Sequence, residues 1–154
     1  MSVSSGDKAP DFDLPTDGGG SLALKDLKGK KVVLYFYPKD STPGCTTEAN
    51  DFRDLRDSFE GAGAVIVGAS KDSVKRHDNF KAKQHINFPL LSDEEGTLCN
   101  DYGVWVLKKL YGREYMGIER ATFLIDGKGM IRYVWRKVRV KGHAQEVLDK
   151  AREI

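Results

Sequence analysis

The chain has 154 residues, of which 40% are hydrophobic and 31% charged, with a formal net charge of +2. This length and composition are typical of an ordinary globular protein, and they exclude disordered and fibrous chains. The nearly balanced charge argues against a general polyanion binder. Cys45 and Cys99 are too far apart for a zinc-finger spacing, and two cysteines do not make a disulfide framework.

The N-terminal residues 1–8 lack the apolar stretch of a secretory signal peptide. No run in the chain approaches the roughly 18 apolar residues that a membrane-spanning helix needs. We therefore expect a cytoplasmic protein without membrane contact, in a compartment that keeps thiols reduced. We expect residues 1–154 to form a single domain.

The first predicted elements are short. Residues 9–14 alternate in a way that indicates a short strand, residues 17–21 (D-G-G-G-S) predict a turn, and residues 22–24 predict an extended or helical piece. Three consecutive glycines could suggest a phosphate-binding loop. That interpretation fails because the run opens no helix and lacks the Gly-Lys-Ser/Thr ending.

The next stretch, Val32–Tyr37, is a continuous apolar and aromatic run that predicts a buried strand. Pro38 ends the strand because proline has no N–H to give to a ladder. A helix over residues 43–60 should follow, with Thr42 as its N-cap and Pro43 as its first residue. The Thr42 hydroxyl is then expected to accept a hydrogen bond from the N–H of Cys45.

The remainder of the chain alternates between strand and helix patterns. We expect strands over 64–69, 121–125 and 130–136, an extended piece over 88–91, and helices over 73–85, 94–102 and 143–152. The strands on either side of the turn at 126–129 should form a hairpin. This order predicts an α/β fold with a central mixed β-sheet flanked by helices.

Cys45 is the residue whose position has the clearest chemical consequence. It stands in the first turn of the predicted helix, where unpaired N–H groups and the positive end of the helix dipole stabilise an anion, and thiolate is the reactive form of cysteine. An apolar stripe continues below it in Ala49, Phe52, Leu55 and Phe59, so the sulfur should be half-buried. The alternative is a small buried residue without chemistry.

The residues around Cys45 resemble a known family. Pro38, Thr42 and Cys45 stand as P-x-x-x-T-x-x-C, which is similar to the active-site motif of the peroxiredoxins. The longer string Y-P-K-D-S-T-P-G-C-T-T-E-A resembles the bacterioferritin comigratory protein and peroxiredoxin Q subfamily. Further resemblance extends along the chain in A-P-D-F-D-L-P, F-P-L-L-S-D, Y-G-V-W and G-I-E-R-A-T-F-L-I-D.

The resemblance implies a thioredoxin-like peroxiredoxin fold and a thiol-dependent peroxidase that reduces hydrogen peroxide and organic hydroperoxides without a cofactor or metal. It gives Cys45 the role of the peroxide-attacking thiolate, Thr42 that of a hydroxyl partner, Pro38 that of a shield, and Arg120 that of a charge acting on thiolate and peroxide. Three supporting residues are Pro43, Gly44 and Glu48. Glu48 either holds Arg120 in an ion pair or is simply an acid near a helix start.

Regeneration of Cys45 is where the chain departs from the subfamily patterns. The two positions that usually carry a resolving cysteine hold Asn50 and Lys81. Cys99 either resolves Cys45 through a disulfide or is a small buried residue. The resemblance therefore implies a one-cysteine mechanism and a monomer, regenerated by thioredoxin, glutaredoxin or a low-molecular-weight thiol.

Other candidates have simpler explanations. His77, His85 and His143 share no metal-ligand spacing, and we expect surface or helix-end positions for them. Residues 132–141 interleave aromatic and basic side chains, which suits either single-stranded nucleic acid or, as we favour, a charge-guarded edge strand. Trp105 is expected near the apolar pocket of Cys45. The competing function is a non-catalytic redox-sensing or chaperone-like module on the same fold.

Overall fold

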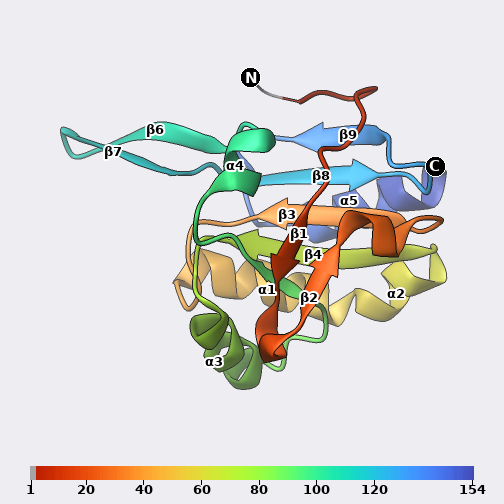
Figure 1. Ribbon diagram of the computed structural model, residues 1–154, viewed down its shortest axis with the longest axis horizontal. Coiled ribbons are helices and arrows are strands. Elements are labelled where there is room, and N and C mark those ends of the chain that lie inside the picture. The colour runs from red at the N-terminus through yellow and green to blue at the C-terminus, as the bar shows by residue number, and fades with distance from the viewer. Residues whose placement is uncertain (1–2) are drawn as a thin grey trace.

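The computed structural model describes residues 3–154, and its centre is a five-stranded sheet with the order β5-β4-β3-β8-β9 (Figure 1). β3 and β5 run parallel to β4, whereas β8 is antiparallel to both β3 and β9. The bounds are β3 Lys31–Phe36, β4 Ala64–Ser70, β5 Leu90–Ser92, β8 Ala121–Ile125 and β9 Ile131–Trp135. The predicted central mixed sheet is thereby confirmed.

Both faces of this sheet are covered, which explains the unbroken apolar run of β3. Val32, Leu34 and Phe36 belong to one buried cluster. Val33 and Tyr35 alternate with them and belong to a second cluster, because successive side chains of a strand point to opposite faces. The two cysteines divide in the same way, with Cys99 in the first cluster and Cys45 in the second.

The helices are distributed over these two faces. α1, α2, α3 and α5 contribute buried side chains to the cluster of Cys45, whereas α4 contributes to the cluster of Cys99. Their bounds are α1 Pro43–Asp54, α2 Arg56–Gly61, α3 Val74–Gln84, α4 Thr97–Asp101 and α5 His143–Glu153. No helix in the described part of the chain is both long and apolar enough to cross a membrane.

Most predicted strands and helices are confirmed to within a few residues, but the single helix over 43–60 is wrong. Leu55 leaves the helical conformation, with φ −98° and ψ 2°, and divides the segment into α1 and α2. Its N–H is shared between the carbonyl groups of Asp51 and Phe52. No glycine or proline lies at the break, so the sequence pattern gave no sign of it.

A small hairpin at the N-terminal end covers the sheet from the α4 side. β1 (Asp13–Pro15) and β2 (Ser21–Ala23) are antiparallel, with the short 3-10 helix η1 (Asp17–Gly19) between them and η2 (Leu24–Leu27) after them. The expected strand over 9–14 therefore begins later than predicted. The expected turn at 17–21 is confirmed.

A second hairpin was not predicted at all. β6 (Trp105–Leu110) and β7 (Arg113–Ile118) form a two-stranded sheet of their own, which extends away from the central sheet at the left of Figure 1. Tyr111 and Gly112 form its tip, and both have positive φ, 50° and 77°. We refer to residues 105–118 as the arm.

Candidate active site

The first turn of α1 presents Cys45 at the third helical position. Thr42 precedes the helix in an extended conformation, Pro43 begins it, and Thr46 donates its N–H to the Thr42 carbonyl at 2.8 Å. The Thr42 hydroxyl does not accept from Cys45, as the sequence had suggested; it donates to the Lys39 carbonyl at 2.9 Å. The capping prediction is therefore wrong at this atom, although the start of the helix is correct.

Arg120 reaches the sulfur of Cys45 from the segment between β7 and β8. Its Nη2 lies 3.4 Å from the Cys45 Sγ, and its Nη1 donates to the Glu48 Oε1 at 2.6 Å. Cys45 and Glu48 are almost fully buried, whereas the Arg120 side chain keeps 17% of its surface exposed. Glu48 was expected either to hold Arg120 in an ion pair or to be simply an acid near a helix start. The geometry is that of the ion pair.

Gly44 explains how the guanidinium group can come so close to the first turn. A Cβ atom added to Gly44 would lie 3.2 Å from the Arg120 Nη2, which is tighter than an ordinary contact. Any larger residue here would push the cation away from Cys45. Pro38 lies half-buried after β3 and precedes the loop that leads to Thr42.

Burial and charge have opposite effects on the pKa values of the two residues of the ion pair, Glu48 and Arg120. Burial raises the pKa of Glu48 to about 7, although Arg120 acts to lower it. Burial disfavours the charge of Arg120, but Glu48 and Cys45 together raise the pKa of the guanidinium above its ordinary value. Among the described residues, the Glu48 Oε2 is buried without a hydrogen-bond partner. Glu48 is thus bound through one oxygen and can be titrated near neutral pH.

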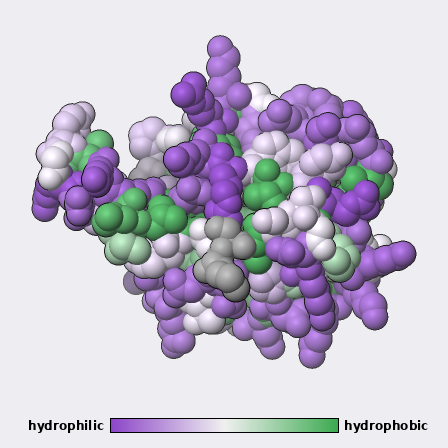
Figure 2. Space-filling view, turned by 90° about the horizontal axis from the view of Figure 1, so that it is seen from above, coloured by the Kyte–Doolittle hydropathy of each residue, from purple (hydrophilic) through white to green (hydrophobic). Residues whose placement is uncertain are grey.

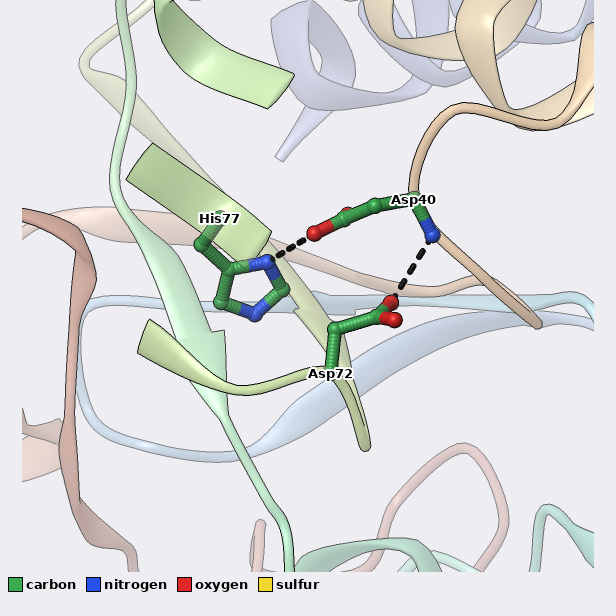
Figure 3. A group of neighbouring side chains, drawn as sticks. All are labelled: Asp40, Asp72 and His77. Carbon is green, nitrogen blue, oxygen red and sulfur yellow. Dashed lines mark hydrogen bonds and ion pairs between the residues drawn. The ribbon is translucent and has the colours of Figure 1, made fainter. Parts of the chain in front are cut away.

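A buried network fixes the loop before Thr42, and sequence reasoning missed it. The Asp40 carboxylate accepts from the Tyr37 hydroxyl at 2.5 Å and lies 2.6 Å from the His77 Nδ1 (Figure 3). The backbone N–H of Asp40 donates to the Asp72 carboxylate at 2.8 Å, and the His77 Nε2 lies 2.9 Å from the Leu91 carbonyl. A carbonyl can only accept, so His77 donates through Nε2, and an ionised Asp40 requires donation through Nδ1 as well.

The structure tests the surface or helix-end positions that were expected for the three histidines. His77 is fully buried, so its predicted surface position is wrong, while His85 is exposed at the end of α3. His143 begins α5 but is buried, and its Nε2 lies 2.8 Å from the Thr122 Oγ1. Burial, together with the charge of Arg120, lowers the pKa of His143 to about 4.

Asp40, Asp72 and His77 place possible metal ligands within 4.8 Å of one another. These atoms already have partners, and the Asp72 Oδ1 accepts from the Arg76 Nε at 2.9 Å. A cation would have to displace the proton of the His77 Nδ1 and compete with Arg76. The donor set therefore fits a hydrogen-bonded anchor for the loop rather than a metal centre.

Cys99 has quite different surroundings. It is fully buried on α4, and its N–H donates to the Asp93 carboxylate at 2.9 Å. Burial, followed by the hydrogen bond and charge of Asp93, raises the pKa of its thiol well above the usual range. Trp105 packs against the cluster of Cys99, and not against that of Cys45 as expected.

The comparisons with known proteins agree on one family. The sequence profile described as the AhpC/TSA family matches residues 5–134. The putative peroxiredoxin bcp of Coxiella burnetii is 57% identical, covering 97% of this chain and 99% of that protein. The peroxiredoxin Bcp of Bacillus subtilis is 53% identical, covering 100% of this chain and 98% of that protein.

Solved structures give the same result. The PrxQ of Xylella fastidiosa superposes with a TM-score of 0.94 at 42% identity, covering 99% of this chain and 98% of that one. The bacterioferritin comigratory protein of Xanthomonas campestris, described for its alkyl peroxide reduction activity, gives 0.88 at 48% identity, covering 92% and 90%. The chain therefore belongs to the AhpC/TSA family, within the group of peroxiredoxins that comprises the bacterioferritin comigratory and peroxiredoxin Q proteins.

Proposed function

We propose that Cys45 is the peroxide-attacking residue of this thiol-dependent peroxidase. Its thiolate attacks the terminal oxygen of a hydroperoxide, the O–O bond breaks, and the departing oxygen takes up one proton from the solvent and leaves as an alcohol or, from hydrogen peroxide, as water. Cys45 is left as a sulfenic acid, the first step of the oxidation ladder. The observation that carries this proposal is the Arg120 Nη2 at 3.4 Å from the Cys45 Sγ.

Ionisation of a thiol is too small an effect to make a peroxidase. An ordinary thiol with a pKa of about 8.5 is already about 3% thiolate at pH 7, so full ionisation gains only about thirtyfold in rate. Each further factor of ten requires about 1.4 kcal/mol from the site. That gain has to come from alignment of the O–O bond and from stabilisation of the charge that develops on the departing oxygen.

The residues around Cys45 can supply both effects. Arg120 can donate to the sulfur and to a peroxide oxygen, and Glu48 keeps its guanidinium in place. Because the Thr42 hydroxyl gives its hydrogen to the Lys39 carbonyl, its oxygen is left to accept the hydrogen of a hydroperoxide. Pro38 shields the loop side of the pocket.

The position of Cys99 supports regeneration by an external thiol. Cys45 and Cys99 lie in clusters on opposite faces of the central sheet, so a disulfide between them would require a large rearrangement. Asn50 and Lys81 cannot form one. We therefore propose a one-cysteine cycle in which thioredoxin, glutaredoxin or a low-molecular-weight thiol reduces the sulfenic acid.

Finer assignments follow from the same reasoning. The activity described for the Xanthomonas campestris relative makes alkyl hydroperoxides, beside hydrogen peroxide, the substrates that we propose. The two free cysteines suit a reducing cytoplasm. We also propose that residues 1–154 act as one domain and as a monomer.

The proposed function is tested by intact mass after a peroxide pulse without reductant. We expect one added oxygen on Cys45, which a dimedone-type reagent traps. A Cys45–Cys99 disulfide as the main product would overturn the one-cysteine cycle. A redox-sensing or chaperone-like module would instead retain its sensing or chaperone activity in Arg120→Met, whereas the rate of peroxide reduction should fall about a hundredfold in that variant.

A further inference from the structure

The arm carries an unusual share of exposed apolar surface. Within residues 3–154, all of the large hydrophobic side chains that are strongly exposed lie on it: Leu107, Leu110, Tyr111, Tyr115 and Met116. Tyr111 at the tip is 96% exposed. Figure 2 shows apolar atoms at the left of the view, over the arm and its base, among hydrophilic side chains. Such a concentration of exposed apolar side chains on one projecting element is typical of an interaction site.

These side chains are exposed on both faces of the arm. Leu107 pairs with Met116 on one face, and Tyr115 lies on the other, opposite Lys108. Within residues 3–154, the two strands pair only with each other, and a lone two-stranded hairpin is marginally stable in water. A partner that covers one face would therefore stabilise the arm as well as bind it.

The base of the arm continues into the active site. Arg120 follows the last residue of β7 by two positions. The Lys108 side chain lies against Gly117, where an added Cβ would be 3.3 Å from its Cδ. Burial lowers the pKa of Lys108, and Arg120 lowers it further, which places this ammonium group in the electric field of the catalytic guanidinium. A protein bound to the arm would therefore sit beside Cys45.

The charge of the arm selects among possible partners. It carries three cations, Lys108, Lys109 and Arg113, against one anion, Glu114. Lys109 and Glu114 are 3.5 Å apart, so the excess positive charge comes from the other two. Two copies of the arm would bring like charges together, whereas an acidic surface would be attracted.

We propose that the arm is the docking surface for the protein that reduces Cys45, a dithiol protein whose reactive cysteine is surrounded by apolar side chains and carboxylates. This inference rests on the proposed function of Cys45. One partner thiolate attacks the sulfenic sulfur, and with one proton the hydroxyl group leaves as water, which gives a mixed disulfide. The second partner thiol then loses its proton to the solvent and attacks the partner's own sulfur in this disulfide, and Cys45 departs as a thiolate. The partner is oxidised to a disulfide, and the sulfenic acid is reduced.

The test separates the two half-reactions. Cys45 is first oxidised with one equivalent of peroxide, and its return to the thiol is then followed with reduced thioredoxin or with dithiothreitol. We expect the double variant Leu107→Thr/Met116→Thr to lose about tenfold or more in the rate with thioredoxin. Its rate with dithiothreitol and its peroxide oxidation step should stay within about twofold of the wild type, because a small thiol needs no docking surface.

Charge variants sharpen the test. Arg113→Glu should slow reduction by thioredoxin and flatten the salt dependence of that rate, whereas Lys128→Glu, in the turn beyond β8, should change neither. If an arm variant also slows the peroxide step, it disturbs Arg120. In that case the variant to use is Tyr111→Asn at the tip, where asparagine tolerates the positive φ. It should slow reduction by thioredoxin and leave the peroxide step unchanged.

Three results would overturn the proposal. Thioredoxin could reduce the arm variants as fast as the wild type, or it could reduce the wild type no faster than dithiothreitol does. The arm could also prove to bind a second copy, seen as a concentration-dependent dimer in sedimentation that the variants abolish. Failure of Cys45 to be oxidised by peroxide would instead contradict the proposed function itself.

Discussion

Cys45 and Cys99 are both buried, and the charged groups beside them have opposite signs. Cys45 is 2% exposed and Cys99 is 0% exposed, so exposure hardly separates them. Their neighbours do: Cys45 has the guanidinium of Arg120 at 3.4 Å and lies in the first turn of α1, whereas the carboxylate of Asp93 accepts the N–H of Cys99. A cation favours the thiolate and an anion opposes it.

The surrounding structure reinforces this contrast. Cys45 directly follows Pro43 and Gly44, which are exposed, so the first turn of α1 lies at the protein surface. Cys99 is enclosed in the cluster that fills the opposite face of the sheet. The proposed function thus makes one cysteine the reactive group, while the other belongs to the packing of the opposite face.

Replacing each cysteine in turn is the most direct way to break this comparison. We expect Cys45→Ser to abolish peroxide turnover, a loss of more than about a thousandfold, since the nucleophile is gone. Cys99→Ser should keep turnover within about twofold, after allowance for a lower stability of about 1 kcal/mol or more from burying a hydroxyl group. Turnover with dithiothreitol as reductant measures both. Equal losses in the two variants would show that Cys99 takes part in the cycle.

Arg120→Met tests whether the cation is what distinguishes the two sites. Loss of one preorganised donor to a developing oxyanion costs about a hundredfold in rate. We expect a drop of this size in the rate constant for oxidation of Cys45, measured by stopped-flow fluorescence. The alkylation of Cys99 in unfolded protein should be unchanged, which serves as the matched control. A loss below about threefold would place the charge stabilisation elsewhere.

How far the sequence could predict this contrast depends on the distance over which each contact is made. The strand before Pro38, the helix start at Thr42 and the placement of Cys45 are local, and turn and capping chemistry predicts them. The contact of Arg120 with Cys45 joins segments far apart in the chain, so it depended on the family resemblance. The inward direction of His77 and the partner of Asp40 carried no local signal, because α3 is polar on most of its surface.

The arm and the break at Leu55 illustrate other limits. The arm lacks the alternation of a half-buried strand because both of its faces are exposed, so a periodicity argument passes over it. Only the Tyr111-Gly112 turn, with two positive φ values, could have indicated a hairpin. The break at Leu55 leaves Phe52 and Phe59 in the same cluster, so the apolar stripe continues across it.

Glu48→Gln tests the ion pair between Glu48 and Arg120 through the pH dependence of the peroxide rate. Because the pKa of Glu48 is about 7, the carboxylate takes up a proton as the pH falls from 8 to 6, and its hold on Arg120 weakens. We expect the ratio of wild-type to variant peroxide rates to be a few-fold at pH 8 and to approach one at pH 6. A ratio that is constant with pH would mean that Glu48 keeps one charge state throughout.

His77→Gln tests the anchor of the loop that leads to Cys45, and here the expected effect is on stability rather than on rate. Burial lowers the pKa of His77, but the hydrogen bond and charge of Asp40 outweigh it and raise the pKa above 6.5. A histidine whose pKa is raised on folding stabilises fully below the unfolded pKa and loses that contribution as the pH rises through the folded value. The free energy of unfolding of the wild type should therefore fall as the pH rises above about 6.5.

The variant should lack this fall and be less stable at pH 6 by about 3 kcal/mol, the usual cost of removing one partner from a buried charged pair. Urea unfolding at pH 6 and pH 9 measures both quantities. His85→Gln, at the exposed end of α3, is the matched control and should behave as the wild type does. A wild-type stability that rises from pH 6.5 to pH 9, or a variant that keeps the wild-type slope, would assign the charge of this network to a group other than His77.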